Sequence, residues 1–308
     1  MVGGMKMTEK NLYRNKTKMK TSLGSKVFDS CNIVFMIILM VAIIIPLWHV
    51  LCASFSNPSD YIRHSGLLLK PLNANLDAYK AVISNKNILT GYKNTLFILV
   101  IGTSLNLFAT LIAAYVLSRK NVLWNNILMI GIVFSMYFNG GMIPFYLVVK
   151  SMGLNNSIWS LIIPGAISTY NLIIMRTAMA CVPDSLEESA KLDGASHWTI
   201  LWRIMVPLVK PTIAVLCLYY AVAHWNSWFN AMLFIRDKAE FPLQLILREI
   251  LIQNDTSAMT AGGGNDEYLI SETIQYATIV VATLPILTIY PFIQRYFVKG
   301  VMIGAVKG

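Results

Sequence analysis

The ionisable and nucleophilic side chains of this sequence are too scattered for chemical catalysis. His49 and His224 stand inside long apolar segments, where an imidazole could relay a proton. The same segments contain no Asp or Glu, and the sequence has no Ser-His-Asp or Cys-His arrangement, no HExxH motif and no Walker A loop. Its four cysteines form no CxxC pair, so we expect no disulfide framework and no metal site. We predict that the chain is not an enzyme and holds no cofactor, and that each histidine is a hydrogen-bonded structural residue.

The elements that carry these residues are long apolar segments. Of the 308 residues, 56% are hydrophobic and 13% charged, whereas a soluble domain averages about 25% charged residues. A helix that spans a bilayer needs about 20 mostly apolar residues, and helices are favoured because each satisfies its own backbone hydrogen bonds in lipid. We predict an all-α membrane protein with six transmembrane helices within residues 31–298, near Cys31–Cys52, Thr95–Leu117, Ile127–Val149, Ile158–Ala180, Thr212–Ile235 and Tyr276–Val298.

The distribution of Lys and Arg predicts the topology. If the basic tail over residues 1–30 is cytoplasmic, the cytoplasmic segments carry 16 of the 25 Lys and Arg residues and the outer segments carry 9. The positive-inside rule then places this tail, the tail 299–308 and a long loop over 181–211 in the cytoplasm. The net charge of +10 is explained by a basic tail that faces the anionic lipid of the bilayer, so no nucleic-acid partner is expected.

The long cytoplasmic loop has the sequence signals of two short helices. Ser185 followed by Glu188 matches a capping box at the start of the first helix. Gly194 can take the left-handed conformation that ends it. Ser196 can cap a second helix, and Pro207 would end that helix, because the residue before a proline avoids helical geometry. Taken alone, these residues indicate only a capped helix pair on the cytoplasmic face.

The spacing within this loop resembles a family signature. Glu188-Ser189-Ala190 is followed by three residues, Gly194, nine residues and Ile204-Met205-Val206-Pro207. ATP-binding-cassette importer permeases carry a loop of the form Glu-Ala-Ala, three residues, Gly, nine residues and Ile-x-Leu-Pro. The sequence departs from that form only at Ser189 and Val206. The string Asp193-Gly194-Ala195 is similar to the carbohydrate-uptake, MalG-like branch of these permeases.

The resemblance covers nearly the whole chain. Several strings look like those of a subgroup that imports complex oligosaccharides, including oligosaccharides that contain uronates, and the last ten residues look like that family's C-terminal ending. These strings are Tyr92-Asn94-Thr95, Ala114-Tyr115-Ser118-Arg119, Asn139-Gly140-Gly141-Met142-Ile143-Pro144, His224-Trp225-Asn226 and Lys299–Gly308. The resemblance implies a multi-pass subunit in a bacterial plasma (inner) membrane, with the binding-protein-dependent permease fold.

The resemblance also implies the partners and a mechanism. A second, homologous permease subunit would complete the translocation path, an extracytoplasmic solute-binding protein would deliver an oligosaccharide, and two ATPase subunits would bind ATP and Mg. The helices of the 181–211 loop would dock on an ATPase subunit and act as levers when ATP closes the ATPase dimer. The residues that we expect to couple the chain to the ATPase are Glu187, Glu188, Ser189, Ala190, Asp193, Gly194, Ala195 and Pro207.

The substrate path is predicted from aromatic and amide side chains within the apolar segments, because aromatic faces stack on sugar rings and amides bind sugar hydroxyls. Two interpretations stay open for each of them. Trp and Tyr also gather at bilayer interfaces, and Asn also links neighbouring helices. The candidates are Tyr137, Asn139, Tyr170, Asn171, Tyr220, Trp225, Asn226, Trp228 and Asn230.

Two other functions remain as alternatives. A permease of the same superfamily could import another class of solute, although the aromatic residues of Thr212–Ile235 favour a sugar. An ion-coupled secondary transporter is a further alternative, but the absence of Asp and Glu from the apolar segments disfavours it.

Overall fold

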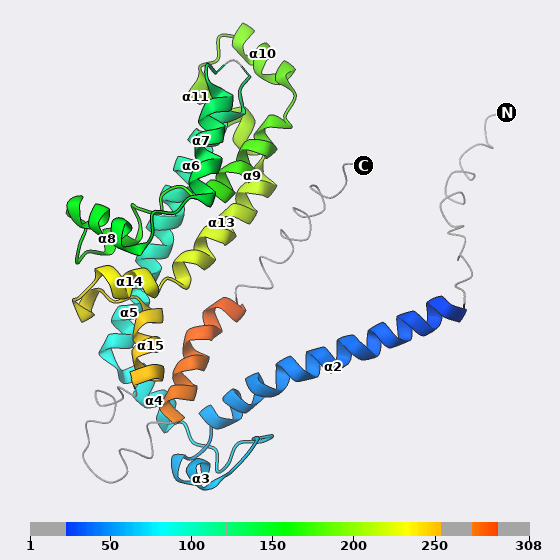
Figure 1. The fold of residues 1–308 in the computed structure, drawn as a ribbon. Coiled ribbons are helices and arrows are strands. Elements are labelled where there is room, and N and C mark those ends of the chain that lie inside the picture. Colours follow the sequence, from blue (N-terminus) through cyan, green and yellow to red (C-terminus); the bar gives the residue numbers. More distant parts are fainter. Residues whose placement is uncertain (1–22, 121, 254–272, 289–308) are drawn as a thin grey trace, which may run out of the picture. The chain divides into compact units, whose positions relative to one another are not determined.

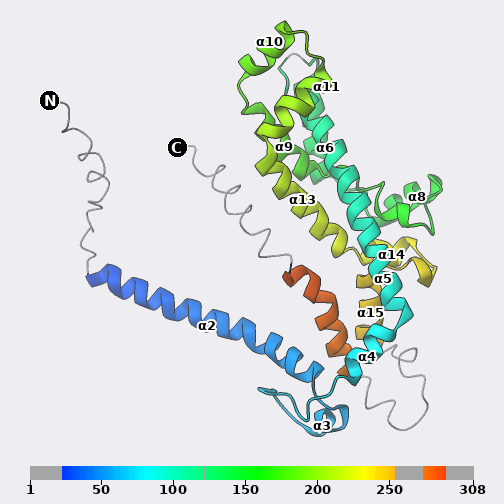
Figure 2. The same cartoon turned by 180° about the vertical axis from the view of Figure 1, so that it is seen from behind.

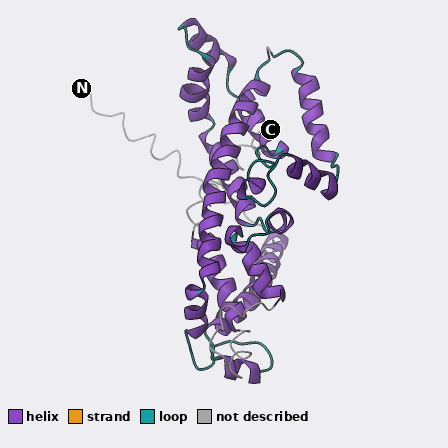
Figure 3. Ribbon diagram, turned by 90° about the vertical axis from the view of Figure 1, so that its left-hand side faces the viewer, coloured by secondary structure: helices purple, strands orange, loops and turns teal. Residues whose placement is uncertain are grey.

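The computed structural model describes residues 23–120, 122–253 and 273–288, and in these ranges the chain forms helices joined by loops, with no strand (Figure 3). The chain divides into two units, one ending at Val50 and one beginning at Leu51. The predicted all-helical architecture is confirmed for these residues. The tail 299–308 and most of the tail 1–30 lie outside them.

The first unit is dominated by one long helix, α2 (Leu23–Ser54), which contains the predicted span Cys31–Cys52. Its mean hydropathy is 2.8 over the most apolar window, and that window has no buried residue. A helix that is apolar on all sides is typical of a membrane span. The last turn of α2 belongs to the second unit, where Cys52 and Ala53 pack against Leu68 in a small apolar cluster.

The second predicted span lies within one continuous helix of 33 residues, Lys86–Ser118, which we call the long helix. It consists of α5 (Lys86–Phe97), a π-helical turn η1 (Ile98–Gly102) and α6 (Thr103–Ser118). π-turns inside α-helices are rare and often lie at functional sites. In Figure 1, α6 lies beside α9 (Thr169–Ala180), and Figure 2 shows the same arrangement from behind.

The third predicted span, Ile127–Val149, is not one helix. It is broken into α7 (Asn125–Tyr137) and α8 (Met142–Ser151), and the two axes differ by 116°. The break has a local cause. Gly141 has φ +90°, which glycine adopts at little cost, and its N–H donates to Asn139 Oδ1 at 2.9 Å. Mean hydropathy along the segment carries no sign of this bend.

The fourth predicted span, Ile158–Ala180, is also interrupted. A short 3₁₀ helix, η2 (Ile158–Leu161), is separated from α9 by an irregular stretch that contains Pro164 and Gly165. Because α9 has only 12 residues, it is about 18 Å long, which is shorter than the hydrocarbon core of a bilayer. The predicted span is broken because of Pro164, since a proline in the interior of an α-helix removes one backbone hydrogen bond.

The fifth predicted span, Thr212–Ile235, forms α13 (Lys210–Trp225) and then a separate short helix, α14 (Phe229–Phe234). The chain leaves the helix at Asn226 and resumes it at Phe229, so the prediction of one continuous helix to Ile235 is wrong. A helix over His197–Leu208 precedes α13 and meets it at an angle of 85°.

The sixth predicted span, Tyr276–Val298, is described over its first half by a helix from Thr273 to Thr288. By length and composition, two helices of the described residues can cross a membrane, or four if each bent pair forms one span. The span count of six therefore stays a prediction.

Two apolar clusters form the core of the second unit. One joins the long helix to α15 (Leu243–Gln253), α14 and the helix Thr273–Thr288. The other joins α6, α9, α13 and the π-helix η3 (Ile200–Met205). The second unit also contains three smaller elements, namely α3 (Pro58–Arg63), α4 (Asp77–Ser84) and the 3₁₀ helix η4 (Lys238–Glu240).

Candidate functional site

The first helix of the predicted coupling loop is α10 (Asp184–Leu192), which lies at one end of the second unit (Figure 1). It begins directly after Pro183, and its N-cap makes no side-chain hydrogen bond. The capping box predicted for Ser185 is therefore wrong, because Ser185 lies inside the first turn. Acidic residues in that turn, Asp184 and Glu187, complement the positive end of the helix dipole instead.

The C-terminal end of α10 agrees with the prediction. Gly194 has φ +77°, in the left-handed region. Its N–H donates to the Lys191 carbonyl at 3.0 Å, and the Ala195 N–H donates to the Ala190 carbonyl at 2.9 Å. These two bonds define a Schellman motif, which satisfies carbonyls that the helix end leaves free. Gly194 thus gives α10 a fixed end.

The second helix of the loop starts as predicted but ends later. Ser196 Oγ accepts a hydrogen bond from the Thr199 N–H at 3.3 Å and caps α11 (His197–Thr199). The chain continues through η3 into α12 (Val206–Leu208), so Pro207 does not end it. The reason is a change of register: α12 starts after a π-helix, and Pro207 falls in its first turn, where a missing N–H costs little.

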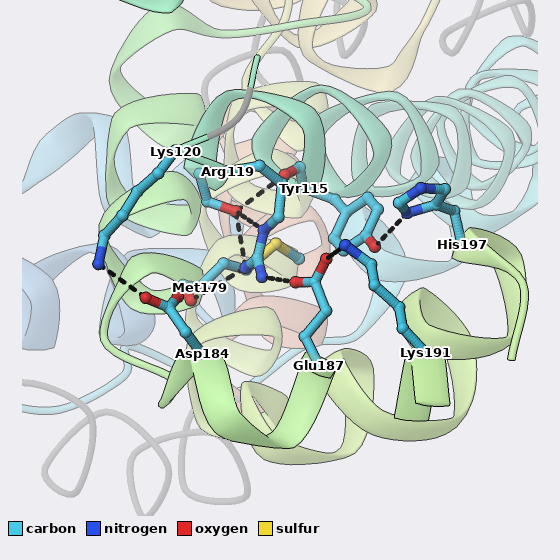
Figure 4. A network of polar contacts seen from close by, with 9 residues as sticks. Tyr115, Arg119, Lys120, Met179, Asp184, Glu187, Lys191 and His197 are labelled. Atoms are coloured by element: carbon cyan, nitrogen blue, oxygen red, sulfur yellow. Dashed lines mark hydrogen bonds and ion pairs between the residues drawn. The ribbon is translucent and has the colours of Figure 1, made fainter. Parts of the chain in front are cut away.

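An ion pair ties α10 to the end of the long helix. Arg119 caps α6, and its Nη1 donates to Glu187 Oε2 (Figure 4). The two side chains are 13% and 9% exposed. Removal of one partner from a buried pair typically costs about 3–5 kcal/mol, because the other charge is left uncompensated. The Glu187 carboxylate, which we expected among the coupling residues, therefore points inward and is bound by Arg119 rather than presented on the surface of the loop.

Arg119 contacts two further elements. Its Nε and Nη2 donate to Ser118 Oγ at 3.1 and 3.0 Å, and Nη2 also donates to the Met179 carbonyl in α9 at 3.4 Å. Its guanidinium lies 5.1 Å from the ring centroid of Tyr115, within the range of a cation–π interaction. One side chain therefore joins α6, the end of α9 and α10.

Two more ion pairs lie beside this one (Figure 4). Lys191 Nζ lies 2.9 Å from the other Glu187 oxygen, and Lys120 Nζ lies 2.7 Å from Asp184 Oδ2. Burial acts to raise the pKa of Glu187, but the hydrogen bonds and positive charges of Lys191 and Arg119 outweigh it and bring that pKa below its ordinary value. The hydrogen bond from Lys120 likewise lowers the pKa of the exposed Asp184 carboxyl.

The second half of the loop is held from the same turn of α6. Tyr115 OH lies 3.0 Å from His197 Nδ1, the first residue of α11. A cavity of about 460 Å³ opens between the end of α6 and the loop, and all its lining residues except Val122 are charged or polar, with Arg119, Glu187 and Glu188 among them. Tyr115, Arg119, Lys191 and His197 are not among the residues predicted for this site. The sequence feature that points to them is the spacing of Tyr115 and Arg119, which are four residues apart at the end of an apolar segment and so lie on one face of a helix.

The other predicted coupling residues lie on the surface of the loop. Glu188, Ser189, Asp193, Gly194 and Pro207 are exposed, and Ala190 and Ala195 are half-buried. Leu192, at 90% exposure, is the most exposed apolar side chain of α10. An apolar residue flanked by exposed acids suits a cleft with apolar and basic residues.

The predicted substrate-path residues are not brought together as one group. Tyr137, Asn139, Tyr170, Asn226, Trp228 and Asn230 are exposed, whereas Asn171, Tyr220 and Trp225 are buried. The Tyr220 hydroxyl lies 2.8 Å from Thr110 Oγ1 and accepts from the Ser168 N–H at 3.2 Å. Trp228 carries the Arg248 guanidinium 4.8 Å above its ring. Tyr220 therefore links α13 to α6 and to the stretch before α9, a role that the sequence had suggested only for Asn.

His224 is a structural residue, as predicted. It is buried in α13, and its Nε2 lies 2.6 Å from Asn106 Oδ1 in α6. The Asn106 amide donates to the carbonyls of Gly165 and Ala166 at 2.6 and 2.9 Å. The pair therefore satisfies backbone groups of the irregular stretch between η2 and α9, which have no partners within a helix.

The chain is similar to known transport proteins in both sequence and structure. The chain is 43% identical over 290 residues to the protein LplC of Bacillus subtilis (strain 168), with 94% of this chain and 98% of LplC covered. It is 41% identical to the polygalacturonan/rhamnogalacturonan transport system permease protein YtcP of the same organism, with 93% and 100% covered. A chain of a bacterial ABC transporter involved in the import of the acidic polysaccharide alginate superposes with a TM-score of 0.82 at 30% identity, with 90% of this chain and 99% of that chain covered.

A family model agrees with these likenesses. The model described as "Binding-protein-dependent transport system inner membrane component" matches residues 18–303, which is nearly the whole chain. The resemblance carried by the 188–207 spacing is thereby confirmed. The chain belongs to the family of binding-protein-dependent transport system inner membrane components, and it is a transport subunit rather than an enzyme.

Proposed function

We propose that this chain forms half of the translocation path of an ATP-driven importer for oligosaccharides, with both termini in the cytoplasm. A second, homologous permease would form the other half, two ATPase subunits would bind ATP and Mg, and an extracytoplasmic protein would deliver the solute. The observation that carries this proposal is α10 with its Schellman end and its exposed Leu192 and acids, on a chain of the binding-protein-dependent family. A short helix with a fixed end is suited to transmit a push from a docked subunit.

We further propose that the solute carries carboxylates. Two similar proteins are connected by name with acidic polysaccharides, polygalacturonan in one case and alginate in the other. In this chain, a cavity of about 480 Å³ in the segment 60–73 is lined by Arg63, His64 and Lys70 together with one acid, Asp60. Guanidinium and ammonium groups are the usual protein partners of carboxylates. A neutral oligosaccharide is the alternative.

The test is copurification of the chain with the products of its neighbouring genes, followed by ATPase and uptake assays in liposomes. We expect an ATPase to copurify, and binding protein loaded with an oligouronide to stimulate hydrolysis more than the same protein with a neutral oligosaccharide. A Gly194→Asp variant should lose this stimulation, because it places bulk and charge at the left-handed end of α10. Uptake on an ion gradient alone, with no ATPase bound, would overturn the proposal.

A paired variant separates solute class from transport itself. Arg63→Gln together with Lys70→Gln removes two cations from the 480 Å³ cavity. Stimulation by an oligouronide should fall, while basal hydrolysis stays as in the wild type. Equal stimulation by acidic and neutral oligosaccharides in both proteins would contradict a carboxylate-bearing solute and leave the importer function intact.

A further inference from the structure

The question that α10 raises is what makes it move together with the rest of the chain. Its covalent connections are short irregular stretches, Cys181–Pro183 on one side and Asp193–Ser196 on the other. Such stretches can absorb a displacement by changing their backbone dihedrals. If only these two stretches joined α10 to the rest of the chain, a displacement of α10 would move the other helices little. Non-covalent contacts of α10 must therefore transmit the movement.

The buried polar contact between α10 and the end of the long helix is the ion pair of Arg119 with Glu187 (Figure 4), and Ala190 of α10 packs beside it against the apolar cluster of α6, α9, α13 and η3. A second pair, Lys120 with Asp184, connects the same two segments, but its side chains are 83% and 54% exposed. Exposed pairs contribute little, because water screens them and long side chains lose freedom in forming them. The ion pair of Arg119 with Glu187 is therefore the polar contact that can hold α10 rigidly against the end of α6.

The geometry around Arg119 makes this connection rigid. The guanidinium uses Nη1 for Glu187, Nε and Nη2 for Ser118, and Nη2 also for the Met179 carbonyl. Lys191 occupies the second oxygen of Glu187 at 2.9 Å. A planar guanidinium that is bound on several sides has few alternative positions, so a displacement of α10 displaces the end of α6.

Further contacts link the loop to the helices of the second unit. Tyr115, one helical turn before Arg119, contacts His197 of α11 at 3.0 Å, so a single turn of α6 holds both halves of the loop. That turn belongs to the continuous long helix of 33 residues, Lys86–Ser118. Buried residues of α6, α9 and α13 share one apolar cluster. Movement of the loop therefore reaches the helices that would surround a solute.

We propose that Arg119 is a positioning residue of this transporter: by binding Glu187 and the Met179 carbonyl together, it makes α10 move as one body with the long helix, so that a push on α10 opens and closes the translocation path. The inference rests on the proposed function. It assigns no docking contact to Arg119, which is largely buried beneath the loop. The loss of Arg119 should therefore separate ATP hydrolysis from transport and leave docking in place.

The test compares Arg119→Gln and Glu187→Gln with a matched control, Lys120→Gln, which removes the neighbouring exposed pair. Each variant is purified as the full complex and reconstituted in liposomes. We expect both test variants to retain the bound ATPase and its basal rate, and the solute imported per ATP to fall about tenfold, within the usual range of coupling between sites. The control should behave as the wild type. The double variant should be no worse than either single variant, because both remove the same contact.

A second measurement keeps the inference falsifiable if the complex does not assemble. Hydrogen exchange of the α10 amides in the isolated chain should accelerate in Arg119→Gln and stay unchanged in Lys120→Gln. Unchanged exchange, or wild-type import by Arg119→Gln, would overturn the inference. Loss of ATPase binding by both Arg119→Gln and Arg119→Lys would also overturn it and assign the residue to assembly. The wild-type complex alone tests the importer function, so the two failures are distinguishable.

Discussion

His224 Nε2 and Asn106 Oδ1 meet at 2.6 Å in the interior of the second unit and join α13 to α6. The Asn106 amide continues this connection to the carbonyls of Gly165 and Ala166. Two apolar helices and an irregular stretch are thus held by one side-chain amide. In a bilayer such backbone groups have no water to bind, so the internal donor is what allows the chain to leave the helix there.

Replacement of Asn106 by Leu should destabilise the protein. The variant leaves two carbonyls and the His224 imidazole without their partner, and each buried group left unpaired costs about 1–3 kcal/mol. We expect a clearly lower midpoint of thermal unfolding in detergent. Asn226→Leu serves as the control, because within the described part of the chain that exposed amide binds the Val222 carbonyl of its own helix, at 2.9 Å, and no other group. Equal midpoints for the two variants would contradict the role of Asn106.

Gly102 should not tolerate alanine. A Cβ at this position would lie 2.6 Å from His224 Nε2, and overpacking of this kind costs about 1–3 kcal/mol. The Cβ would also push the imidazole away from Asn106. Gly131→Ala in α7 is the matched control, since a Cβ there meets nothing within 4 Å, and this variant should keep or slightly raise the unfolding midpoint. Thermal unfolding of both variants in one detergent decides the prediction.

Gly194→Ala should weaken the end of α10 through backbone strain alone. An added Cβ meets nothing within 4 Å, but φ is +77°, and a left-handed conformation costs a residue with a Cβ about 1–2 kcal/mol. Gly194→Asn should retain more import than Gly194→Ala, because Asn adopts this conformation more readily. The measurement is solute uptake and amide exchange of α10. Identical results for Ala and Asn would show that strain is not the cause.

Acid should loosen α10 through Glu187. The folded pKa of this carboxyl is below its ordinary value of 4.5, so its contribution to stability is complete at neutral pH and is lost as the pH falls through the lowered value. The charged and titratable groups that face it are Arg119, Lys191 and Tyr115. The difference in unfolding midpoint between wild type and Glu187→Gln should shrink below about pH 4.5. A difference that stays constant down to pH 3 would contradict this assignment.

Composition and local chemistry predicted a large part of this protein. The apolar runs predict all-helical architecture, and the spacing from Glu188 to Pro207 predicts the family. Gly194 predicts the end of α10, because its left-handed conformation is a property of the residue itself. These features depend on residues close together in the sequence, where pattern and structure correspond.

The rest depends on contacts between distant residues or on breaks within apolar runs. Arg119 and Glu187 are 68 positions apart, and a charged residue beside an apolar segment is interpreted by default as solvated. The bends at Gly141, after Pro164 and at Asn226 fall inside segments whose average hydropathy is high. Window averages conceal a single Gly or Pro, so the sequence shows these breaks only through the residue types at the break.

The length of α10 has a consequence for recognition. A helix of nine residues is barely stable by itself in water, so without its anchors it would have to fold at the moment of encounter. Its Schellman end and its ion pair with Arg119 hold it formed beforehand. A partner that binds this helix therefore loses little free energy to ordering it. If α10 docks on an ATPase subunit, as we propose, the affinity is governed by the few exposed side chains of α10, and substitutions there would change the choice of ATPase without altering the rest of the transporter.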